Sequence, residues 1–149
     1  MLFISATRLR LRSIWFLLPF LKTNFGTIRQ LKEAMGFLKG KTLIDRKLTF
    51  WTLTAWASEK DMKAYRNSGA HLKAMPKLIN WCDEATAVHW TTESTSLPDW
   101  TEAAQHIAAP EARVSKLYHP TQNHTTKTFP PPRYPSKLEQ VLEPKNRAV

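Results

Sequence analysis

Several residue types are scarce in this chain of 149 residues, and each scarcity excludes a class of protein. The single cysteine, Cys82, excludes an intrachain disulfide and a zinc site built from several thiolates, and it fits a reducing compartment. Four glycines leave little material for a glycine-rich phosphate loop. The apolar run Ile14–Leu21 is interrupted by Pro19 and is far too short to span a bilayer. A chain of this length makes about one domain, whose core requires neither a disulfide nor a metal.

Acidic residues are also scarce in the first third of the chain. Residues 1–50 hold ten Lys/Arg against Glu33 and Asp45, a balance of +8 within a total of +10. Arg8, Arg10 and Arg12 alternate with leucines, which on a strand places all three on one face. Such a stripe could bind an acidic ligand, a phosphate backbone or an anionic membrane surface, and a solvent-facing strand surface is the alternative. Because no nucleic-acid-binding motif is present, we rank nucleic acid as an unlikely partner.

The basic, acid-poor start is also typical of an organelle transit peptide. No small-residue cleavage pattern follows the apolar run, however, and the alternation through Phe3–Arg12 favours a first strand. We therefore expect a mature, cytoplasmic protein without a membrane span.

The first half of the chain predicts one helix and three strands. A helix should begin after Ser13, which can cap it, and continue to Met35, with Gly36 as its stop. Its second half is amphipathic. The predicted strands are Phe3–Arg12, Phe37–Arg46 and Leu48–Ala57.

A second helix should follow at Ser58–Asp61, which has the capping-box pattern. Apolar and small residues recur at helical spacing on its buried side: Met62, Tyr65, Gly69, Leu72, Pro76 and Ile79. Pro76 predicts a kink or a break. With a fourth strand at Ala85–Thr92, the order becomes βαββαβ, the ferredoxin-like α+β unit in which two helices cover one face of an antiparallel sheet.

The other sheet face should then be bare, although the strands are rich in tryptophan. A second copy related by two-fold symmetry is the simplest cover, so we expect a homodimer. We divide the chain into a domain of residues 1–95 and a C-terminal part of residues 96–149. That part should contain one short helix, Leu97–His106, capped by Asp99, and a proline-rich extended tail from His119 to Pro135, poorly ordered unless it packs on a neighbour.

The segment Thr54-Ala-Trp-Ala-Ser-Glu59, followed by Met62–His71 and Met75-Pro76, resembles the antibiotic-biosynthesis monooxygenase group of the dimeric α+β barrel superfamily. The likeness covers roughly residues 1–92. A wider stretch, with Trp81–Ala85, Leu97–Trp100 and His119-Pro120, also resembles uncharacterised bacterial proteins near spheroidene monooxygenase.

The resemblance implies a ligand cavity between the sheet and the helices, and superfamily members oxidise aromatic polyketides without a cofactor, cleave haem or isomerise small molecules. Haem-degrading members carry an asparagine, a tryptophan and a haem-ligating histidine where this chain has Thr7, Tyr65 and Met75. No cofactor is therefore our first expectation, with haem as the alternative, and we predict no metal site.

A cofactor-free oxygenase needs an apolar pocket, and it needs a base or a donor that forms and holds a substrate anion. We predict Tyr65 as that donor and His71 as the base, with Trp56, Trp90 and Thr7 in the substrate-binding wall. Ordinary core packing is the alternative for the tryptophans. A monooxygenase-like enzyme and a non-catalytic small-molecule-binding or structural homodimer both fit these residues, because both need the same cavity.

Overall fold

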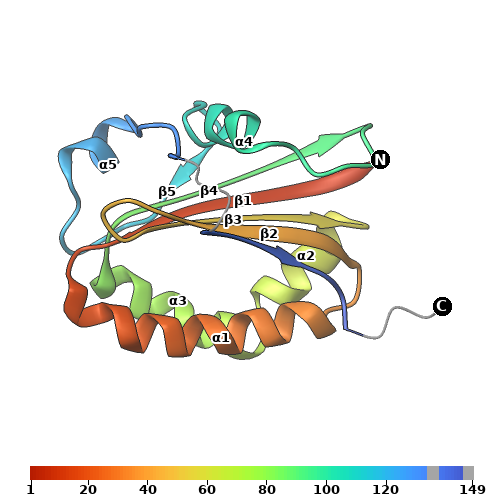
Figure 1. Ribbon diagram of the computed structural model, residues 1–149, viewed down its shortest axis with the longest axis horizontal. Coiled ribbons are helices and arrows are strands. Elements are labelled where there is room, and N and C mark those ends of the chain that lie inside the picture. The colour runs from red at the N-terminus through yellow and green to blue at the C-terminus, as the bar shows by residue number, and fades with distance from the viewer. Residues whose placement is uncertain (134–137, 146–149) are drawn as a thin grey trace.

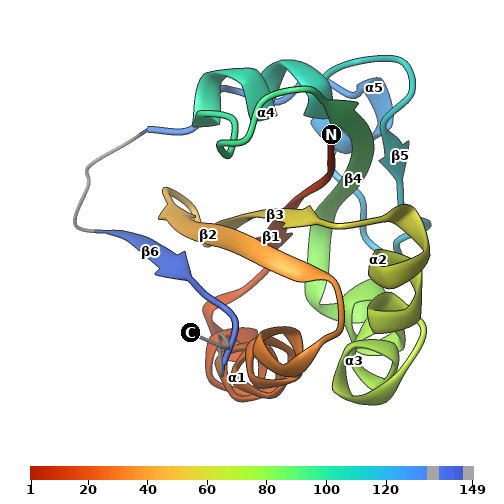
Figure 2. The ribbon, with the colours of Figure 1, turned by 90° about the vertical axis from the view of Figure 1, so that its right-hand side faces the viewer.

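The computed structural model describes residues 1–133 and 138–145, and it contains one six-stranded sheet with helices on both of its faces (Figures 1 and 2). Every neighbouring pair of strands is antiparallel. In sheet order the strands are β5 (Arg113–Val114), β4 (Cys82–Thr92), β1 (Leu2–Leu11), β3 (Thr49–Trp56), β2 (Phe37–Asp45) and β6 (Glu139–Leu142). The order β4-β1-β3-β2 is that of a split βαββαβ unit, so the predicted ferredoxin-like α+β class is confirmed.

One face of the sheet is covered by a short 3-10 helix η1 (Ile14–Phe16) and by α1 (Leu17–Glu33), α2 (Glu59–Arg66) and α3 (Gly69–Trp81) (Figure 2). The predicted caps are present: the Ser13 side chain accepts from the Trp15 amide, and the Ser58 side chain accepts from the Asp61 amide. Each cap satisfies an amide that has no partner inside its helix.

The predicted break at Pro76 is wrong. The chain breaks earlier, between α2 and α3, where Gly69 adopts a φ of +56° that glycine tolerates best. Pro76 lies inside a continuous α3, on its exposed side, as does Leu72. The Leu72 carbonyl, which loses its helical donor at Pro76, can therefore be hydrated by solvent.

The second sheet face is not bare, which corrects the reason for expecting a partner there. The C-terminal part of the chain returns over it as α4 (Trp100–Ile107) and α5 (Gln122–Thr126) (Figures 1 and 2). Trp100 is buried against Trp51 of β3, with the ring centroids 6.4 Å apart, and Ile107 is 1% exposed. The homodimer stays a prediction, but this face gives it no support.

The C-terminal part also forms more structure than an extended tail. Asp99 caps α4 as predicted, accepting from the Glu102 amide. Beyond it, β5 and β6 extend the two edges of the sheet, and α5 lies between them in the sequence. Pro135, the predicted end of the tail, lies outside the described residues. Trp100 and Ile107 of this part share one core cluster with Ile4 and Trp51 of the sheet, so α4 packs directly on the 1–95 domain.

The predicted cationic stripe does not exist as a surface. Arg8 is 4% exposed, and it forms an ion pair of 2.8 Å with Glu84 between the rings of Trp51 and Phe129. Arg10 lies within 3.6 Å of Glu84 and 3.8 Å of Asp83.

Arg12 follows a β-bulge at Arg10/Leu11, so it leaves that face; it bonds Asn80 and stacks over Phe16. Arg8 and Arg10 are paired with acids from a distant strand, whereas Arg12 is exposed and bonds Asn80 of α3.

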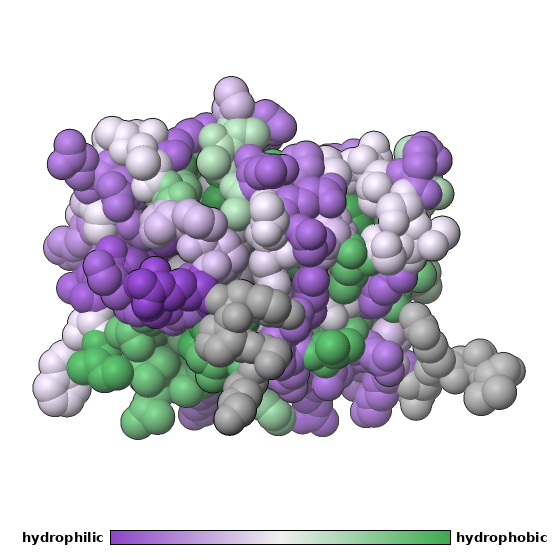
Figure 3. Space-filling view, turned by 45° about the horizontal axis from the view of Figure 1, so that its top comes forward, coloured by the Kyte–Doolittle hydropathy of each residue, from purple (hydrophilic) through white to green (hydrophobic). Residues whose placement is uncertain are grey.

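Large apolar side chains remain exposed on the first turns of the α1 region, and green surface gathers over the start of this helix at the lower left of Figure 3. No helix among the described residues has the length and apolar character needed to cross a membrane.

The Arg8–Glu84 pair generates a stability prediction. Glu84→Gln keeps the shape of the side chain but leaves the buried Arg8 cation without its counter-ion, so it should lower the free energy of unfolding by about 3 kcal/mol. Urea denaturation followed by tryptophan fluorescence measures this. The control is Glu59→Gln, which removes the exposed Glu59–Lys63 pair and should change stability very little. Equal losses in the two variants would contradict the buried pairing.

Candidate functional site

A cavity of about 590 Å³ lies between the sheet and the layer of α2 and α3. A second hollow of about 120 Å³ extends it towards α1, and the two share their central wall. The shared lining comes from β1, β3, α2 and α3: Ser5, Thr7, Leu9, Thr54, Tyr65, His71, Met75 and Leu78. The volume is in the range of pockets that bind small molecules.

The alternation of β1 explains why this face has a polar floor. Ser5, Thr7 and Leu9 point towards the helices, whereas Ile4 and Ala6 point into the core under α4. No hydrogen bond involves the hydroxyls of Ser5 and Thr7 among the described residues. Both hydroxyls are therefore available as donors to a ligand oxygen. Thr7 lines the cavity, and its role in substrate binding stays a prediction.

His71 lines the cavity from α3, and its tautomer follows from its contacts. Nδ1 lies 3.1 Å from the Arg66 carbonyl oxygen, which can only accept, so Nδ1 carries the proton. Nε2 therefore holds a lone pair, and no hydrogen bond to it occurs among the described residues. Burial of the imidazole lowers the pKa of His71 below its ordinary value, so the ring is neutral at neutral pH. A neutral, unpaired imidazole nitrogen is the chemistry of a general base.

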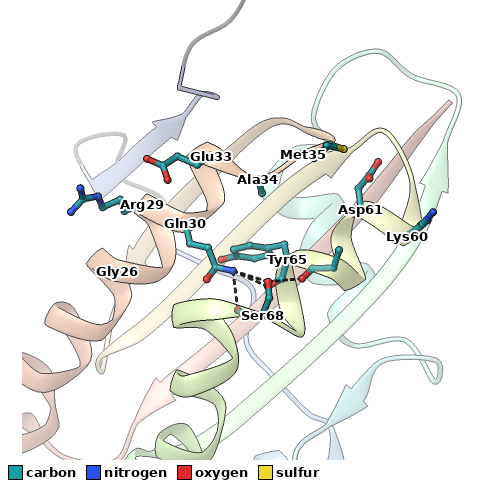
Figure 4. Close-up of a pocket in the computed structure, with 11 residues that line it drawn as sticks. Gly26, Arg29, Gln30, Glu33, Ala34, Met35, Lys60, Asp61, Tyr65 and Ser68 are labelled. Atoms are coloured by element: carbon teal, nitrogen blue, oxygen red, sulfur yellow. Dashed lines mark hydrogen bonds between the residues drawn. The ribbon is translucent and has the colours of Figure 1, made fainter.

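Gln30 of α1 holds the junction that presents His71. Its side-chain oxygen accepts from the His71 amide at 2.8 Å. Its side-chain nitrogen donates to the carbonyls of Tyr65 and Ser68 at 3.1 and 2.9 Å (Figure 4). One amide group thus fixes the end of α2 and the first turn of α3. Sequence reasoning missed this role, because the three partners lie 35 to 41 positions away.

Tyr65 lies between two rings, 5.3 Å from Trp56 and 4.9 Å from His71 between centroids. Its hydroxyl donates to the Thr27 carbonyl at 3.1 Å, and burial raises the pKa of the phenol well above its usual range. The only proton of this hydroxyl is already engaged. The predicted donation to a substrate anion would require Tyr65 to give up Thr27.

Trp56 is fully buried and forms part of the cavity wall. Its Nε1 donates to the Thr54 hydroxyl at 2.9 Å, which fixes the indole plane.

Trp90 does not join this group, and its predicted place in the wall is wrong. It pairs with Ile4 in the sheet, so it points to the opposite face, where it stacks on His106 of α4 at 3.8 Å. His89, which pairs with Ser5, takes the cavity side instead. Burial is the main cause that lowers the pKa of His89, and neighbouring Arg66 adds to it. The pairing of β4 with β1 would have identified His89 as a cavity residue, because His89 pairs with Ser5 and both side chains lie on the same face of the sheet.

Cys82 is not a nucleophile of this site. It is fully buried at the start of β4, and burial raises the pKa of its thiol to about 12. Among the described residues, no group of three or more His, Cys, Asp or Glu side chains is placed to hold a metal ion.

A further hollow of about 710 Å³ lies between α1 and α2 on the outer side of the helices, rimmed by charged side chains such as Arg29, Glu33 and Asp61 (Figure 4). Of the predicted site residues, it contains Tyr65 alone. The interior cavity brings together Thr7, Trp56, Tyr65 and His71, so it is the candidate site.

No protein-family model matches the chain, and no curated protein matches it. Several solved structures are similar, among them the following two. A putative antibiotic biosynthesis monooxygenase from Nitrosomonas europaea has 13% identity and a TM-score of 0.57, over 64% of this chain and 93% of the other. A mutant form of SnoaB, a cofactor-independent oxygenase from Streptomyces nogalater, has 13% identity and a TM-score of 0.54, over 66% of this chain and 98% of the other. At these identities the likeness shows the fold, and the narrower resemblance to proteins near spheroidene monooxygenase stays a prediction.

Proposed function

We propose that this protein is a cofactor-independent oxygenase that acts on a small, electron-rich aromatic or otherwise apolar metabolite in the interior cavity. The observation that carries the proposal is His71, which lines the cavity: its Nδ1 proton is bound to the Arg66 carbonyl, and no described residue bonds its Nε2. The likeness in fold to a cofactor-independent oxygenase supports the same class of reaction.

The residues present can perform the proton transfer that such a reaction needs. His71 Nε2 takes a proton from an acidic C–H or O–H group of the substrate. The hydroxyls of Ser5 and Thr7 donate to the oxygen on which the negative charge develops, in a site that is partly closed to water. Trp56 is fully buried against Tyr65, so it supports the apolar wall of the cavity from behind that ring.

The electrons come from the substrate itself. Its carbanion reduces molecular oxygen to a peroxide anion, which the His71 imidazolium protonates to a hydroperoxide. The neutral His71 then takes the remaining proton from the same carbon as the O–O bond breaks, and it passes this proton to the departing hydroxide. A CH₂ group and O₂ thus become a carbonyl group and H₂O. No external reductant is required for this balance.

A non-catalytic small-molecule-binding protein is the second candidate, because the same cavity serves both. A saturable Soret band on adding haemin would instead support a haem enzyme, with His71 or His89 as the imidazole available to the iron.

Oxygen consumption with a panel of hydroxylated aromatic compounds tests the proposal. For a compound that is turned over, His71→Gln should lower kcat by about a hundredfold or more, because the base is lost. His106→Gln is the control, since His106 lies on the opposite face against Trp90. A compound that binds in the cavity without oxygen uptake by the wild-type protein would favour the binding protein.

The pH dependence follows from the same histidine. Since the pKa of His71 is lowered, the base should stay active through neutral pH, and kcat/KM should fall only below the ordinary histidine pKa of about 6.5. We expect His89→Gln to leave this acid limb in place. An acid limb above that value, or one that disappears in His89→Gln, would assign the base elsewhere.

A further inference from the structure

Five large apolar side chains are exposed at the start of the helical layer. Their exposed fractions are 61% for Ile14, 85% for Trp15, 78% for Leu18, 39% for Leu21 and 72% for Phe25. We call these five residues the α1 stripe. Single exposed apolar residues are ordinary, but a contiguous group indicates a binding surface.

The stripe has helical spacing. Ile14, Leu18, Leu21 and Phe25 follow one another at intervals of four, three and four, which places them along one side of the helix. Phe20 and Leu31 of the same helix are 3% and 2% exposed and pack into the core. The helix therefore has two apolar sides, and the core uses only one of them. Figure 3 shows apolar surface at this end of the molecule.

The charges around the stripe have one sign. Helices α1 and α3, which pack on each other, carry five cations, namely Lys22, Arg29, Lys32, Lys73 and Lys77. Their one acidic residue is Glu33, at the far end of α1, and it pairs with Lys145 at 3.3 Å. An apolar helix side flanked by cations is the pattern of a helix that lies in the interface of an anionic membrane.

We propose that the α1 stripe binds the surface of an anionic lipid bilayer, with the helix parallel to the membrane plane. Trp15, Leu18 and Phe25 would enter the boundary between headgroups and acyl chains, and Lys22 and Arg29 would remain among the phosphates. A second copy fits the stripe less well. An isologous contact would bring Lys22 and Arg29 of one copy against the same cations of the other.

Vesicle flotation tests the proposal with the full chain. Vesicles of phosphatidylcholine containing phosphatidylglycerol should carry the protein to the top of the gradient, whereas vesicles of phosphatidylcholine alone should not. The double variant Leu18→Ser/Phe25→Ser should lower the bound fraction about tenfold or more, because two of the largest exposed apolar groups are lost. Lys22→Gln/Arg29→Gln should weaken binding to the anionic vesicles and remove most of its advantage over neutral ones.

The matched control is Val141→Ser on β6, which removes an apolar side chain of similar exposure (67%) outside the stripe, and it should float like the wild-type protein. Circular dichroism shows that each variant is folded. Three results would overturn the proposal: no flotation with anionic vesicles, flotation unaffected by the Leu18/Phe25 variant, or a dimer in sedimentation equilibrium that this variant dissociates. The last result would assign the stripe to a second copy.

Discussion

The alternation of side chains along β1 is the constraint on which the rest of the structure depends. This strand lies in the middle of the sheet and pairs with both β3 and β4, so its register fixes which side chains of its neighbours point to each face. Ser5 and Thr7 face the helices and leave a polar, hollow side. Ile4 and Arg8 face α4 and α5 and belong to a filled side. A shift of one residue would exchange the two.

The filled side shows how the chain covers a sheet face by itself. Trp51 would be a large exposed apolar group on a bare βαββαβ sheet, and Trp100 of α4 covers it. Near the other end of the same face, the Glu84 carboxylate joins Arg8 to Thr121, the cap of α5, so that strand and C-terminal segment are connected by polar contacts as well. Because α4 and α5 cover this face, we expect a ligand in the helix-side cavity instead.

The sequence predicted the βαββαβ order and the serine and aspartate caps, because these depend on local periodicity and on single residues. It also predicted that Thr7, Trp56, Tyr65 and His71 surround one cavity. The prediction was wrong for Trp90, because strand register decides which sheet face its side chain occupies. It was also wrong for Arg8, because the partner Glu84 is distant in the sequence. A single residue of register moves a side chain to the other face, and composition cannot show which acid an arginine will meet.

The central claim is that the helix-side cavity, lined by β1 and α3, is the ligand site. The most direct measurement is the change of backbone amide and imidazole NMR signals on titration with naphthol, a small electron-rich aromatic alcohol. The account predicts saturable shifts at Ser5, Thr7 and His71, with the signals of Trp100 and His124 unchanged. Shifts confined to Trp100 and His124, or no saturable shift at any of these positions, would contradict it.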